Sequence, residues 1–89
     1  MTNLGDLKIL GTIEGDDKPQ KLDEISILAN ADVIRDLGIF LINAAYEMEL
    51  NEVEHVHLQD SIQNFSYNNH ADVIAINQEI VKPIDSTKP

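Results

Sequence analysis

The sequence predicts an α+β fold: a two-layer sandwich in which one long helix covers a four-stranded, mainly antiparallel sheet. Three observations lead to this prediction. The chain has 89 residues, which suits a single domain. Residues 31–50 carry apolar side chains at helical spacing, and short segments of alternating polarity lie on both sides of them. The expected element order is therefore β-β-α-β-β, with one domain over residues 1–82 and a frayed tail over residues 83–89 after Pro83.

Two strands are expected before the helix. In residues 7–14, LKILGTIE, polar and apolar side chains alternate well enough for a strand, although Gly11 weakens it. Residues 24–29, EISILA, form the second expected strand. Between them, the sequence GDDKPQK at residues 15–21 is polar and rich in turn-forming residues. We therefore expect an antiparallel hairpin joined by this loop.

The helix is expected from Ala31 to about Leu50. Asn30 is a favourable N-cap, and Asp32 in the first turn suits the positive end of the helix dipole. One broad face is apolar and consists of Val33, Ile34, Leu37, Phe40, Leu41, Ala44, Ala45 and Met48. The opposite face is polar and consists of Asp32, Asp36, Asn43 and Glu47. The apolar face should pack on the sheet.

Three residues of this helix need a separate explanation. Gly38 lowers helix stability by about 1 kcal/mol relative to alanine, which indicates close packing at that position. Ile39 and Ile42 flank the apolar face. They are either the edge of the core or a partly exposed patch.

Two further strands are expected after the helix, over residues 53–59 and residues 72–78. The connection between them, DSIQNFSYNNHA, is polar and has room for a short strand around residues 64–67. With the first hairpin, these strands would complete a four-stranded sheet with one open face.

His55 and His57 lie two residues apart in the third expected strand. Because side chains alternate along a strand, Val56 and Leu58 should face the helix and both imidazoles the open face, with their Cα atoms about 7 Å apart. Two histidines could bind zinc, but zinc needs at least a third ligand, and His70 lies in a loop. We therefore interpret the histidines as polar residues of the sheet face and predict no metal site and no cofactor.

The composition argues against several classes of protein. The chain has no cysteine, which excludes disulfides, thiolate metal sites and cysteine nucleophiles. It has no glycine-rich phosphate loop and no G-x-S-x-G motif, so we do not expect an enzyme. The first residues, MTNLGDLKIL, lack the basic and apolar segments of a signal peptide, and no apolar run is long enough for a membrane span. We therefore expect a cytoplasmic protein.

Net charge is the strongest compositional signal. Sixteen acidic residues face six basic ones, which gives a formal charge of −10. Such a chain repels nucleic acids and anionic membranes and associates quickly with basic proteins. Two surfaces could make this contact, and the sequence does not choose between them. One is the helix, with Asp32, Asp36 and Glu47; the other is the open sheet face, with Glu14, Glu24, His55 and His57.

The stretch from the helix to the last strand resembles a known protein family. The helix IRDLGIFLINAAYEMEL, the segment EHVHLQD and the strand DVIAIN are similar to small bacterial immunity proteins of polymorphic-toxin and contact-dependent inhibition systems, and most of all to immunity protein family 32. The resemblance implies a non-enzymatic cytoplasmic protein that binds one cognate toxin domain, often a basic nuclease. It also implies that binding blocks the active site of the toxin.

A different class of function fits the same composition. The chain could be a small acidic regulatory or adaptor module that binds other proteins and forms a homodimer through Ile39 and Ile42. A stable dimer without a basic partner would favour this alternative.

Overall fold

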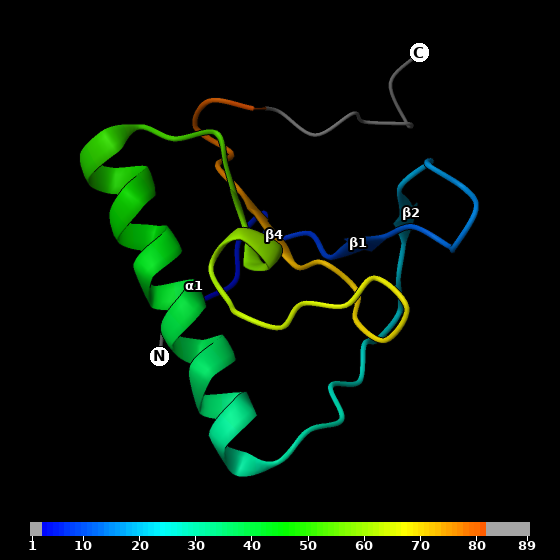
Figure 1. Cartoon of the computed structure of the whole chain (residues 1–89). Helices are drawn as coiled ribbons and strands as arrows, with labels where there is room; N and C mark the ends of the chain where they lie inside the picture. The colour runs from blue at the N-terminus through cyan, green and yellow to red at the C-terminus, as the bar shows by residue number, and fades with distance from the viewer. Residues whose placement is uncertain (1–2, 82–89) are drawn as a thin grey trace.

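The computed structural model describes residues 3–81 and is α+β, with one α-helix, four short strands and one 3₁₀ helix (Figure 1). In chain order the elements are β1 (Leu10–Gly11), β2 (Gln20–Lys21), α1 (Ala31–Asn51), β3 (His55–His57), η1 (Leu58–Asp60) and β4 (Ile74–Ile76). The predicted class and the order β-β-α-β-β are confirmed. The predicted tail, residues 83–89, and residues 1, 2 and 82 of the predicted domain lie outside the described residues.

Helix α1 begins and ends with local capping interactions. Asn30 has an extended backbone, and its side-chain oxygen accepts a hydrogen bond from the Val33 N–H at 3.0 Å. At the other end, Glu52 adopts the left-handed conformation with φ 53°, which stops the helical hydrogen-bond pattern after Asn51. The predicted N-cap is confirmed, and the helix extends one residue beyond the expected end.

The strands form two separate sheets rather than the predicted single sheet. Strand β1 pairs antiparallel with β2, and β3 pairs antiparallel with β4. Among residues 3–81, no ladder joins the two pairs into the four-stranded sheet of a sandwich. Figure 1 places β1 and β2 on the side of the molecule away from α1. Within the described residues, the long helix therefore packs beside the β3–β4 pair, η1 and the segment after η1 rather than on a four-stranded sheet.

The second predicted strand, residues 24–29, was placed too late in the chain. Strand β2 instead lies at Gln20–Lys21, inside the segment predicted to be a loop. The cause is a tight turn: the Asp16 N–H donates to the Ile13 carbonyl at 2.8 Å, and the Asp16 carboxylate accepts from the Lys18 N–H at 3.0 Å. This turn reverses the chain early, so Gln20 meets Gly11 and residues 24–29 remain outside any strand.

The second hairpin is also shorter than predicted. Strand β3 covers only His55–His57 of the expected 53–59, because the chain turns into η1 at Leu58. The short strand expected around residues 64–67 is not found: Asn64 has φ 65°, a left-handed conformation that interrupts extended backbone.

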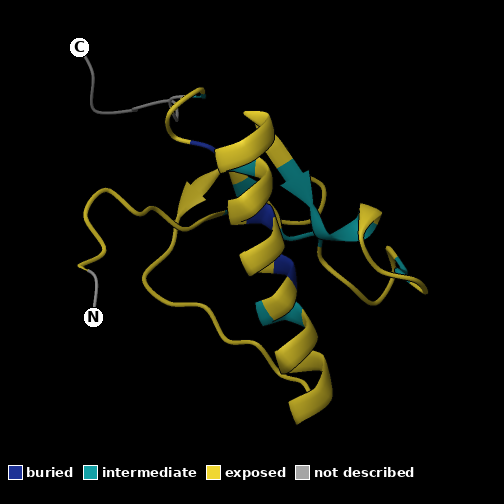
Figure 2. Cartoon of the chain, turned by 90° about the vertical axis from the view of Figure 1, so that its left-hand side faces the viewer, coloured by how far each residue is buried: buried dark blue, intermediate teal, exposed yellow. Residues whose placement is uncertain are grey.

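Few side chains are buried. Among the described residues, the buried ones are Phe40 at 5%, Ala44 at 1% and Asn77 at 7% exposed. Buried and half-buried residues gather where α1 faces β3, η1 and β4 (Figure 2). The predicted apolar face of the helix was too broad, because Val33, Ile34 and Leu41 are exposed. A two-stranded hairpin covers a narrower strip of helix than a four-stranded sheet would.

Candidate protein-binding surface

One side of α1 is an acidic face, which consists of Asp32, Asp36, Asn43 and Glu47. Their spacing of four and seven residues places all of them on one side of the helix, and all are exposed. Asp32 forms an ion pair with Arg35 at 2.9 Å, and Glu47 accepts a hydrogen bond from the Asn51 amide at 2.8 Å. Asp36 has no ion pair to another residue in the range 3–81. Its carboxylate is therefore available to an incoming cation.

An open hollow of about 440 Å³ lies beside this face. Four of its lining residues come from the helix and three from the segment after η1: Asp36, Ile39, Phe40, Asn43, Ser61, Ile62 and Gln63. Its lining combines a carboxylate, an amide pair and the apolar side chains of Phe40, Ile39 and Ile62. Such a lining suits a long basic side chain, whose apolar stem contacts hydrocarbon while its charged end meets a carboxylate.

The second predicted surface is not assembled as expected. It depended on one sheet that would carry Glu14, Glu24, His55 and His57 on its open face. Glu14 and Glu24 are exposed but lie outside the strands, and the two sheets are separate. His55 is exposed, whereas His57 is half-buried. The described structure therefore gives these four residues no common sheet face.

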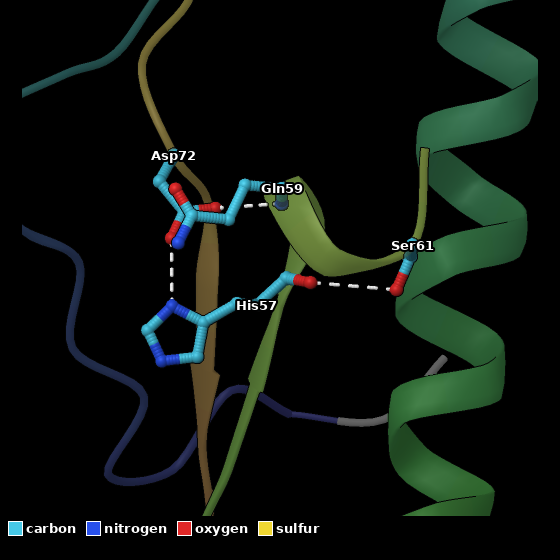
Figure 3. Close-up of polar contacts among 4 residues, drawn as sticks. All are labelled: His57, Gln59, Ser61 and Asp72. Carbon is cyan, nitrogen blue, oxygen red and sulfur yellow. Dashed lines mark hydrogen bonds and ion pairs between the residues drawn. The ribbon is translucent and has the colours of Figure 1, made fainter. Parts of the chain in front are cut away.

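His57 is instead part of a hydrogen-bonded junction between β3 and β4 (Figure 3). Its Nδ1 lies 2.7 Å from Asp72 Oδ2, and it donates the proton, since a carboxylate can only accept. The other oxygen of Asp72 accepts from the Gln59 N–H at 2.9 Å. The Ser61 hydroxyl donates to the His57 carbonyl at 3.3 Å. One carboxylate thus fixes both the imidazole and the start of η1.

The three histidines have different local roles. The rings of His55 and His57 have centroids 6.2 Å apart, but Nδ1 of His57 is occupied by Asp72. In the loop after η1, Nδ1 of His70 accepts a hydrogen bond from the Ser66 N–H at 2.9 Å. Within residues 3–81, no three histidine or acidic side chains are grouped so that they could hold a metal ion. The polar interactions of His57 and His70 hold the backbone in place.

Sequence reasoning missed two of the structurally important polar residues. Asp72 acts across 15 residues of sequence, and nothing in its local pattern distinguishes it from the other acidic residues. The Asn77 amide is buried: its Nδ2 donates to the Val53 carbonyl at 3.2 Å, and its Oδ1 accepts from the Glu79 N–H at 3.0 Å. Sequence reasoning treated Ile62 as a possible apolar anchor of the connection but did not predict that Ser61, Ile62 and Gln63 line a hollow, because their position depends on the junction at Asp72.

In the described part of the chain, α1 is the only α-helix, and it is not apolar enough to cross a membrane.

Comparisons of this chain with protein-family models, with characterised proteins and with solved structures find no match. The resemblance to immunity protein family 32 therefore stays a prediction.

Proposed function

We propose that this chain is an immunity protein that binds a basic toxin domain and blocks its active site, and that the acidic face of α1 makes the contact. The observation that carries the proposal is the position of Asp36. Asp36 belongs to the exposed acidic face and is also one of the residues that line the hollow, together with Phe40 and Ile62. A charged stripe beside a partly apolar hollow offers both attraction and a place for an anchoring side chain.

The first step of binding would be electrostatic. The chain carries sixteen acidic against six basic residues, so its field attracts cationic surfaces over roughly a Debye length, about 8 Å at physiological salt. A nuclease gathers lysine and arginine at its active site to hold an anionic substrate. The acidic face would meet that site first, because attraction concentrates and orients the encounter there.

The second step would be occlusion. A lysine or arginine of the toxin would enter the hollow, contact Phe40 and Ile62 with its methylene groups and form an ion pair with Asp36. The flanking carboxylates of Asp32 and Glu47 would pair with neighbouring basic groups at the rim. With its basic residues engaged, the toxin could no longer hold its substrate.

The proposal is tested by growth rescue in bacteria. The test applies if the neighbouring reading frame ends in a small basic domain; that domain is then the probe, expressed alone and then together with this chain. We expect toxicity alone and growth with the chain. Continued toxicity, with both proteins soluble, would contradict the proposed pairing.

A matched pair of variants then locates the contact. Asp32→Asn/Asp36→Asn removes two negative charges from α1, and Glu14→Gln/Glu24→Gln removes two from exposed residues outside the strands. Both variants have the same net charge, so any difference between them reports position rather than overall field. We expect the first variant to lose rescue and the second to keep it.

The adaptor alternative keeps one supporting observation, which is the exposure of Ile39 and Ile42 on α1. Ile42 lies outside the hollow and bears on self-association, whereas Ile39 also lines the hollow.

A further inference from the structure

The side of α1 that faces away from the hairpins is apolar and exposed. We call it the outward face; it consists of Ile34, Gly38, Leu41, Ile42, Ala45 and Tyr46. The spacing of three, four and seven residues makes a continuous seam along the helix. Ile42 is 58% exposed, and Ile34, Leu41 and Tyr46 are exposed as well. Figure 2 looks onto this side of α1 and shows it exposed over most of its length. Nothing in residues 3–81 covers it.

Gly38 lies in the middle of this seam, and no close neighbour within residues 3–81 explains a glycine at this position. The sequence predicted close packing there, but a Cβ added to Gly38 would meet no heavy atom within 4 Å. A glycine inside a helix is unfavourable because it leaves the backbone free in the unfolded chain. Ala45, seven residues later, is a second small residue on the same side of the helix. Small residues at a helix contact allow the backbone of a second helix to approach closely at those positions.

The charges at the two ends of the seam are opposite and symmetrically placed. Arg35 lies seven residues before Ile42, and Glu49 lies seven residues after it. Residues 37–46, between them, carry no charged side chain. Two copies of α1 that cross antiparallel at Ile42 would place each Arg35 opposite the Glu49 of the other copy. A parallel pair would place like charges together, which is unfavourable.

We propose that the outward face of α1 binds a second copy of this chain, with the helices antiparallel and the two-fold axis near Ile42. The contact is isologous, since the same seam serves both copies. The copies would bury Ile42 and Leu41 at the centre and pair Arg35 with Glu49 at both ends. Gly38 would then have the close neighbour that the single chain lacks.

The outward face lies on a different side of the helix from Asp36, so a dimer would leave the acidic face free. Each chain carries a charge of −10, which opposes self-association. The seam limits this cost, because its only charges are the complementary pair at its ends. The dimer does not depend on the proposed immunity function, and either can fail without the other.

The experiment measures the mass of the full chain in solution by sedimentation velocity over a range of protein concentrations. We expect a reversible dimer. Ile42→Asp should give a monomer with unchanged far-UV circular dichroism. Leu28→Asp is the control: Leu28 is also a large exposed apolar residue, at 101%, but it lies before α1. This control should remain a dimer.

Charge reversal tests the antiparallel arrangement. Glu49→Arg leaves the Arg35–Asp32 pair within the chain intact and places arginine opposite arginine in the dimer. It should weaken dimerisation by about fivefold or more, since two ion pairs are lost per dimer. Arg35→Glu/Glu49→Arg should restore the original affinity.

Three results would overturn the proposal. The first is a chain that stays monomeric up to its solubility limit. The second is a dimer that Ile42→Asp leaves intact. The third is a dimer that the double charge reversal does not restore, because that would exclude the antiparallel pairing.

Discussion

The two hairpins of this molecule are both antiparallel, but they have different side-chain support. Strands β3 and β4 share three paired positions, and the buried Asn77 and the half-buried Asp72 tie their ends to neighbouring backbone. Strands β1 and β2 share two paired positions, and the turn between them is held by exposed Asp16. The hairpin beside the candidate surface is thus longer by one paired position, and polar contacts between residues far apart in the sequence also hold it.

The largest effect is expected from the small core beside the β3–β4 hairpin. Phe40→Ala removes a side chain that is 5% exposed and should lower the free energy of unfolding by about 3–5 kcal/mol. Leu22→Ala, next to Gly11 of the first hairpin, should cost only about 1 kcal/mol, since Leu22 is partly exposed. Urea denaturation measures both. Equal losses would remove the distinction between the two regions.

The next effect concerns the two aspartates that hold the hairpins. Asp72→Ala leaves the Gln59 N–H and the His57 imidazole without their acceptor and should cost about 1–3 kcal/mol. Asp16→Ala removes one exposed turn contact and should cost less than about 1 kcal/mol. Hydrogen exchange at the backbone amides of Gln59 and Lys18 would sharpen the comparison. The Gln59 N–H donates to Asp72 and the Lys18 N–H donates to Asp16, so each exchange rate should rise when its own aspartate is removed.

A smaller effect of the opposite sign is expected at Gly38. In the Ile42→Asp background, where the chain should be monomeric, Gly38→Ala should raise the free energy of unfolding by about 1 kcal/mol. The structure leaves room for the added methyl group. In the wild-type background the same change should weaken the dimer. If Gly38→Ala stabilised the monomeric variant and also left the wild-type dimer as strong or stronger, it would argue against a close helix contact at this position.

The smallest effect is expected far from any contact. Glu14→Gln/Glu24→Gln alters two exposed side chains outside the strands and should change the free energy of unfolding by less than about 0.5 kcal/mol. Thermal unfolding followed by circular dichroism checks this. A larger change would show that the first hairpin has support that its contacts do not reveal.

The helix could be predicted closely from sequence because its signals are local. The Asn30 cap and the apolar spacing act within a few residues, so α1 begins at the predicted residue and ends one residue later than expected. Strand β2 could not be placed in this way. Its position depends on which residues the Asp16 turn brings opposite Leu10 and Gly11, and propensity favoured residues 24–29 instead.

For the same reason, one part of the candidate surface could be predicted from the sequence and the other part could not. Asp32, Asp36 and Glu47 share one face because helical spacing alone decides it. The hollow could not be predicted, since Ile62 and Phe40 line the same hollow only because the chain turns at η1. That turn rests on Asp72, which contacts Gln59 from 13 residues away in sequence. Contacts between residues so far apart leave no pattern in the neighbouring sequence from which they could be predicted.

The most direct test of the proposed function is the affinity of the basic toxin domain for the two charge-matched variants. We expect Asp32→Asn/Asp36→Asn to weaken binding by at least about tenfold, because it removes the carboxylate of the hollow and its neighbour. Glu14→Gln/Glu24→Gln should weaken binding much less. Equal losses in the two variants would contradict the assignment of the contact to α1, since only the overall charge would then matter.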